Sequence, residues 1–129
     1  MHLSQKSGFT LVEILVVVAI MGIIALAVVP SIGGVMDGAE DNNAKSYAVA
    51  LKSGKQTFRL RVADAANQYS SAGNNNARYS LIQPYIDGGS SPASLSGFIG
   101  NEYSANLGAN LNDPVTVTAP SGNTFSSAQ

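Results

Sequence analysis

The chain has no cysteine and no tryptophan, and its single histidine, His2, stands near the N-terminus. Without cysteine there is no disulfide framework, no thiolate metal site and no lipid-modified cysteine anchor. Without a second histidine, the rest of the chain cannot build a histidine-based acid/base relay or zinc site. We therefore expect a protein that is not an enzyme and that holds no cofactor and no metal ion.

Charge is scarce as well: charged residues make up 12% of the chain, and the formal net charge is −1. Basic residues gather at Lys52, Lys55, Arg59 and Arg61, but Phe58 among them falls on the apolar phase of a helix. Nucleic-acid binding depends on a broad basic field, which this composition does not provide. We therefore predict no nucleic acid as a direct ligand.

The longest uniform feature is an apolar run over residues 9–29 that contains one acid, Glu13. As a helix rising about 1.5 Å per residue it would span roughly 31 Å, which matches a hydrocarbon core of about 30 Å. The run therefore predicts one membrane crossing. An ionisable residue inside such a segment is unfavourable for a plain anchor and indicates a function of its own.

Three interpretations of this N-terminus are open. In the first, it is a secretory signal with Ala25-Leu26-Ala27 as cleavage site, which would release a soluble secreted binding domain. In the second, it is an uncleaved anchor, which leaves Glu13 without a role. The third interpretation depends on the run Lys6-Ser7-Gly8-Phe9-Thr10-Leu11-Val12-Glu13, followed by the apolar segment and then by Pro30.

That run resembles the class III signal, the prepilin-type N-terminal methylation motif, of the bacterial type IV pilins and the type II secretion pseudopilins. The resemblance implies that a prepilin peptidase and methyltransferase removes residues 1–8 after Gly8 and N-methylates Phe9, while the apolar helix is retained. It also implies that Glu13 meets the charged amine of a neighbouring subunit during assembly.

Elementary electrostatics supports a partner for Glu13. A lone carboxylate in a dry helix bundle is unfavourable unless it is paired, and the cleaved amine of Phe9 is the nearest available positive charge. Phe9 and Glu13 lie one helical turn apart, so the pair can form within one chain or between chains. Pairing between chains would set the axial register, whereas in the other interpretation Glu13 only reaches the lipid headgroups.

Pro30 lacks a backbone donor and predicts a kink or an opening of the helix. The resemblance implies that the segment from Gly22 to Pro30 becomes non-helical in assembled filaments; the alternative is a gentle kink in an intact helix. Beyond Pro30, apolar and small residues recur at helical spacing as far as Tyr69, so residues 9–30 and 31–69 are predicted as two parts of one long helix. The polar face of the second part is acidic at Asp37 and Glu40 and basic further on.

Residues 70–129 are rich in Ser, Asn and Gly and have room for one small head. Short strands are predicted at residues 97–103, 115–119 and 124–126, with a hairpin turn at residues 120–123. Together with the long helix they predict an α+β fold, which the resemblance describes as a ladle with a small antiparallel sheet. Asn110, Asn112 and Asp113 are predicted to form a turn rather than a calcium site.

We therefore predict a structural subunit of a bacterial type IV pilus, a homo-oligomeric filament assembled by packing of the N-terminal helices. Its other partners would be the prepilin peptidase and the assembly machinery of the inner membrane. The precursor would lie in the inner membrane and the product in a cell-surface filament. The alternative is a pseudopilin of type II secretion in a periplasmic filament. Pseudopilins often carry a calcium loop preceded by a tryptophan, and the absence of that pattern here favours the pilus.

Overall fold

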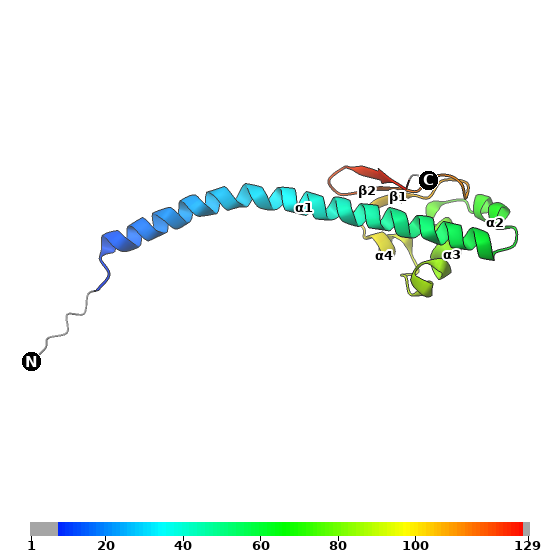
Figure 1. Ribbon diagram of the computed structural model, residues 1–129, viewed down its shortest axis with the longest axis horizontal. Helices are drawn as coiled ribbons and strands as arrows, with labels where there is room; N and C mark the ends of the chain where they lie inside the picture. The colour runs from blue at the N-terminus through cyan, green and yellow to red at the C-terminus, as the bar shows by residue number, and fades with distance from the viewer. Residues whose placement is uncertain (1–7, 128–129) are drawn as a thin grey trace, which may run out of the picture. The chain divides into compact units, whose positions relative to one another are not determined.

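The computed structural model describes residues 8–127, without the side chains of residues 28–33 and 88. It divides into two compact units, Met1–Met36 and Asp37–Gln129. The predicted leader, residues 1–8, lies outside the described residues except for Gly8. The elements (Figure 1) are the helices α1 Leu11–Arg61, α2 Ala65–Ser71, α3 Asn75–Ile82 and α4 Leu95–Ile99, the 3-10 turns η1 Gln83–Tyr85 and η2 Asp87–Gly89, and the strands β1 Ser104–Asn106, β2 Thr116–Thr118 and β3 Thr124–Ser126.

This element order confirms the predicted α+β fold class, with one long N-terminal helix and a small antiparallel sheet. Helix α1 includes both Gly22 and position 30. The side chain of Pro30 lies outside the described residues, and the predicted opening between Gly22 and Pro30 concerns the assembled filament, so it stays a prediction.

The long helix ends earlier than its apolar periodicity predicts. Its last backbone hydrogen bond runs from the amide of Val62 to the carbonyl of Phe58, at 3.0 Å. Asp64 then adopts a left-handed conformation with φ of 60°, which breaks the helix and which Asp tolerates better than most residues. Tyr69 therefore belongs to the separate helix α2. The single helix predicted over residues 31–69 was wrong in this respect, because the helical spacing continues across the break.

The sheet has the order β1-β2-β3, antiparallel throughout, with Val117 of β2 opposite Ala105 and Phe125. The strands predicted at 115–119 and 124–126 are confirmed as β2 and β3. So is the turn between them, in which Gly122 takes a φ of 90°. The strand predicted at 97–103 was wrong: Ser94 caps helix α4 by accepting from the amide of Gly97, and β1 begins only at Ser104.

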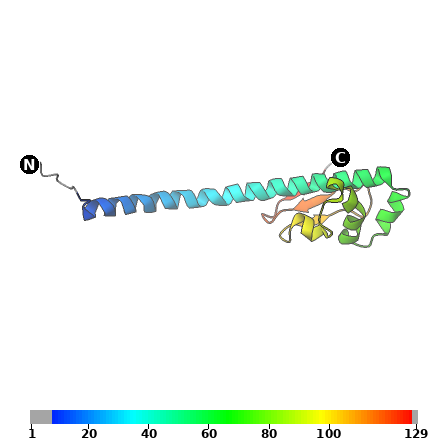
Figure 2. The same cartoon turned by 90° about the horizontal axis from the view of Figure 1, so that it is seen from below.

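The core of the second unit lies between the C-terminal half of α1 and the elements that follow it, which lie along that half in Figures 1 and 2. Leu51 and Phe58 are buried as predicted, whereas Val62 is only half-buried. The second compact unit begins at Asp37. The residues of the predicted helix 31–69 from Asp37 onward therefore belong to the same unit as the head. The other fully buried large side chains are Tyr69, Tyr79, Ile82, Leu107, Val115 and Val117.

Candidate functional site

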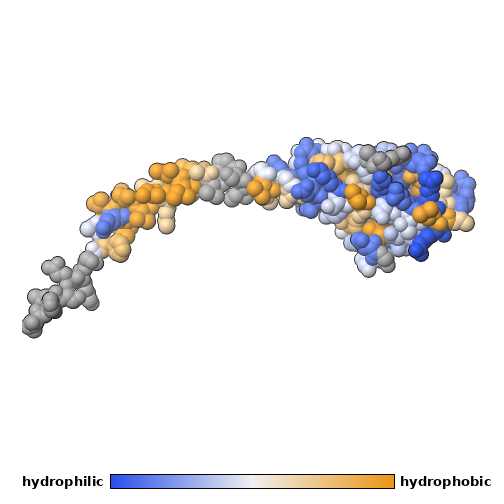
Figure 3. Space-filling view, viewed as in Figure 1, coloured by the Kyte–Doolittle hydropathy of each residue, from blue (hydrophilic) through white to orange (hydrophobic). Residues whose placement is uncertain are grey.

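The first candidate site is the apolar surface at the start of α1. Every large apolar side chain described between Phe9 and Leu26 is exposed, from 47% for Val16 to 85% for Phe9. Figure 3 shows this segment as an almost continuous hydrophobic surface. A helix that is apolar on all sides is stable only when lipid or other helices cover it. The surface is therefore one that the chain cannot bury by itself.

Within the described residues, no helix combines the length and the hydropathy that a membrane crossing needs. The predicted crossing, residues 9–29, ends in residues whose side chains lie outside the described set.

The predicted cleavage site lies just before this surface. Residues 8–10 are exposed and precede the helix, and a side chain added at Gly8 would meet nothing within 4 Å. The peptide bond between Gly8 and Phe9 is therefore outside the hydrogen-bonded helix, where a peptidase can bind an extended backbone. Cleavage and methylation at these two residues stay predictions.

Glu13 closes the N-terminus of α1 through a reciprocal capping box with Thr10. Its carboxylate accepts from the amide of Thr10 at 2.8 Å and from its hydroxyl at 3.1 Å, and its own amide donates to Thr10 Oγ1 at 3.3 Å. The spacing Thr-x-x-Glu is typical of a capping box, and this signal was missed in the predictions made from the sequence. In the uncleaved chain the Glu13 carboxylate is thus held by its own helix, and its predicted pairing with the amine of Phe9 requires cleavage.

The second candidate site is a buried lysine in the head. Lys55 is 3% exposed, and its ammonium donates to the backbone carbonyls of Leu107 at 2.7 Å, Asn110 at 3.1 Å and Asp113 at 2.8 Å. The ring of Tyr69 lies 4.9 Å from the same nitrogen. Lys55 was predicted to lie on the basic face of the helix, although its position four residues after the buried Leu51 puts it on the apolar phase.

The loop that receives Lys55 is shaped by its own polar groups. Asp113 donates from its amide to the carbonyl of Asn110 at 3.2 Å, and its carboxylate accepts from the amide of Asn110 at 2.8 Å. Asn112 points elsewhere and accepts from Arg59 at 3.1 Å. The turn predicted at Asn110, Asn112 and Asp113 is therefore present. Among the described residues no group of three acidic or histidine side chains is placed to hold a metal ion.

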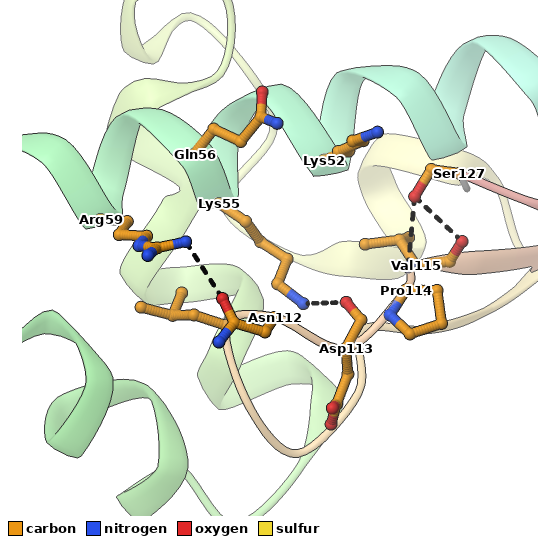
Figure 4. Close-up of a pocket in the computed structure, with 10 residues that line it drawn as sticks. Lys52, Lys55, Gln56, Arg59, Asn112, Asp113, Pro114, Val115 and Ser127 are labelled. Carbon is orange, nitrogen blue, oxygen red and sulfur yellow. Dashed lines mark hydrogen bonds between the residues drawn. The ribbon is translucent and has the colours of Figure 1, made fainter. Parts of the chain in front are cut away.

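The loop borders a hollow of about 490 Å³ on the surface of α1 (Figure 4). Lys52, Gln56 and Arg59 line it from α1, and Asp113 and Ser127 line it from the opposite side. The amide of Asn110 holds the pKa of the Asp113 carboxyl below its usual range. The hollow thus lies between groups of opposite charge, with Lys52 and Arg59 on α1 and Asp113 on the opposite side.

Lys55 gives the head a defined pH dependence. Burial lowers the pKa of Lys55 to about 8, and the Asp113 carboxylate opposes the shift. In the unfolded chain the pKa of a lysine is about 10.4. Between these two pH values the folded protein has therefore released a proton that the unfolded chain retains. Linkage then requires that the free energy of unfolding rise with pH across this window. Urea denaturation of the wild-type chain and Lys55→Met between pH 7 and 10 measures this, and a constant difference between them would contradict it.

Comparison with known proteins gives a match for the N-terminal segment. Residues 3–29 match the prokaryotic N-terminal methylation motif. Three similar proteins are each named type II secretion system core protein G. The one from Klebsiella michiganensis is 43% identical over 60 residues, the one from Aeromonas hydrophila 40% over 60 residues, and the one from Escherichia coli strain K12 39% over 56 residues.

The match is partial on both sides. It covers 46% of this chain and 42% of the Klebsiella and Aeromonas proteins, and 43% of this chain and 39% of the Escherichia coli protein. No solved structure is a significant match. The comparisons thus confirm the resemblance seen in the residues around Gly8 and Glu13.

Proposed function

Because the chain carries the prepilin-type N-terminal segment of the type IV pilin and pseudopilin family, we propose that it is a pseudopilin, a structural subunit of a periplasmic filament of a type II secretion system. The observation that carries the proposal is the match of about half the chain to core protein G of this system in three organisms. From the sequence we predicted a pilus subunit, whereas the relatives favour the alternative, a pseudopilin of type II secretion.

The exposed apolar surface supports a role in assembly rather than in catalysis. Burial of apolar surface away from water is worth roughly 25 cal/mol per Å², and lipid or a helix bundle can provide it. Helices that leave lipid for copies of themselves gain packing contacts with one another. The protein would therefore be held in the inner membrane as a precursor and then transferred, by the assembly machinery, into a bundle of its own N-terminal helices. Removal of residues 1–8 by the prepilin peptidase would precede that transfer and create the amine of Phe9.

Glu13 would set the register of the bundle. In the precursor its carboxylate is satisfied by Thr10, so the helix is capped before assembly. After cleavage the amine of Phe9 offers a positive charge, and a carboxylate in a dry bundle gains most from a partner that is also charged. Each incoming subunit would thus be aligned by an ionic contact at a fixed height of the filament.

Deletion of the gene from its host tests the proposal. We expect the deletion strain to lose secretion of its exported enzymes into the medium and to keep its surface pili, because a periplasmic filament serves export only. Secreted activity in the culture supernatant and electron microscopy of the cell surface measure the two outcomes.

The pilus subunit is the second candidate, supported by the absence of tryptophan and of a calcium-loop pattern. Loss of surface filaments with normal secretion would favour it and contradict the pseudopilin proposal.

The complemented strain tests the processing of the N-terminus. Its purified product should begin at methylated Phe9, whereas a product that begins at Val28 would mean release by signal peptidase and would contradict both candidates.

A further inference from the structure

The ammonium of Lys55 is enclosed by oxygen atoms from one loop of the head. The backbone carbonyls of Leu107, Asn110 and Asp113, which we call the carbonyl cage, accept from it at 2.7, 3.1 and 2.8 Å. Figure 4 shows the side chain running from α1 toward this loop and ending at the carbonyl of Asp113. An ammonium has three donors, and each donor here has one acceptor.

Three carbonyl oxygens that converge on one point are the ligand set that proteins offer to a cation. Their partial negative charges repel one another unless a positive charge lies between them, and carbonyls left without a donor in a buried site are costly. Leu107 also accepts from the hydroxyl of Tyr69 at 2.8 Å, which fixes one member of the cage to helix α2. The loop thus directs three acceptors at the position of the Lys55 nitrogen, where a cation satisfies them together.

Several other contacts also hold this loop, among them the hydrogen bond from the amide of Leu107 to Asn75 Oδ1 at 3.1 Å. Gly108 takes a φ of 73°, and a Cβ there would collide with the Cβ of Asp113, so the backbone folds back tightly on itself. The amide of Asp113 also donates to the carbonyl of Asn110 at 3.2 Å, whereas Lys55 is the donor that reaches all three carbonyls of the cage.

We propose that the loop of residues 107–113 is templated by a cation and that Lys55 of α1 supplies this cation at neutral pH. The ligand class of the cage is an alkylammonium, provided within the chain, and the head folds around it without a metal ion. A lysine in place of a free ion also links the loop to α1 across more than fifty residues of sequence, so loop and helix form as one unit.

The surroundings of the cage act on the amine in both directions. Burial has the largest effect and lowers the pKa of Lys55, the Asp113 carboxylate raises it, Arg78 lowers it, and the ring of Tyr69 faces the nitrogen from α2. Because the pKa of Lys55 remains at about 8, most of the side chain is protonated at neutral pH. The negative face of the Tyr69 ring adds a cation–π contact to the three hydrogen bonds.

The test is chemical rescue on the full-length chain in detergent, read by hydrogen exchange of residues 107–113 with mass spectrometry. Lys55→Ala should raise the exchange rate of this loop by about tenfold or more, because the donor that links all three carbonyls to α1 is lost. Millimolar n-propylammonium, which replaces the deleted atoms, should restore slow exchange in this variant. Arg61→Ala, which deletes an exposed cation from the same helix, is the matched control and should exchange like the wild type.

Lys55→Met keeps most of the length of the side chain without its charge, and it serves if the alanine variant does not fold. Its loop should exchange as fast as that of Lys55→Ala and should not respond to n-propylammonium, because the methionine fills the space. Wild-type exchange rates in Lys55→Met would overturn the proposal, as would failure of n-propylammonium to slow exchange in a folded Lys55→Ala. Slower loop exchange of the wild-type chain on addition of calcium chloride would also overturn it, since the cage would then take a metal ion.

Discussion

Replacement of Glu13 by Ala is expected to stop filament growth while the precursor still inserts into the membrane. Alanine is more favourable than glutamate in a hydrocarbon core, so insertion does not suffer. What is lost is the one ionisable group in the apolar run of residues 9–29, and with it the proposed ionic contact to the amine of Phe9. Membrane fractionation and electron microscopy of sheared filaments measure the two effects.

Two further variants separate the register role of Glu13 from its role as a helix cap. Thr10→Ala removes the hydroxyl of the capping box and keeps the carboxylate, so its filaments should be normal. Glu13→Gln keeps hydrogen-bonding capacity at the cap but has no charge, so it should fail to assemble. Normal filaments from either Glu13→Ala or Glu13→Gln would show that the carboxylate does not set the register.

Replacement of Leu51 by Ala is expected to destabilise the head severely. Leu51 is completely buried where α1 forms one wall of the core, and such truncations cost about 2–5 kcal/mol because they leave a cavity. Small domains unfold with a total of about 5–15 kcal/mol, so a large share of the stability would be lost. Urea denaturation of the full-length chain, followed by the near-ultraviolet signal of its tyrosines, measures the change.

Leu60→Ala is the matched control, because the same side chain is deleted from the same helix at a position that is 85% exposed. We expect its free energy of unfolding to stay within about 0.5 kcal/mol of the wild type. Equal destabilisation by the two variants would mean that the face of α1 that carries Leu51 does not form a wall of the core.

The N-terminal motif could be recognised from the sequence, because cleavage residue, acid and apolar run are local features at fixed spacing. The motif matched over residues 3–29 confirms this resemblance, and the roles given to Gly8, Phe9 and Glu13 stay predictions. The capping box was equally local, since Thr10 and Glu13 stand three residues apart, and it was missed only because Glu13 was interpreted as a membrane-buried acid.

The head was predictable only in part. The strands at residues 115–119 and 124–126 alternate in polarity around a turn that contains Gly122, so short-range patterns were enough. The break at Asp64 and the helix α4 have no such pattern: one depends on a single left-handed residue, and the other on the cap provided by Ser94. Periodicity averages over several residues and does not detect either.

The sequence by itself determined that the chain has one long helix, an apolar N-terminal surface with a single acid, and a small α+β head without disulfides. All of these follow from residue types and their spacing over a few turns. Only the tertiary structure decided where Lys55 lies and what it binds. Its partners are backbone carbonyls, which every residue possesses, so no residue type marks them and only the folded loop brings them together.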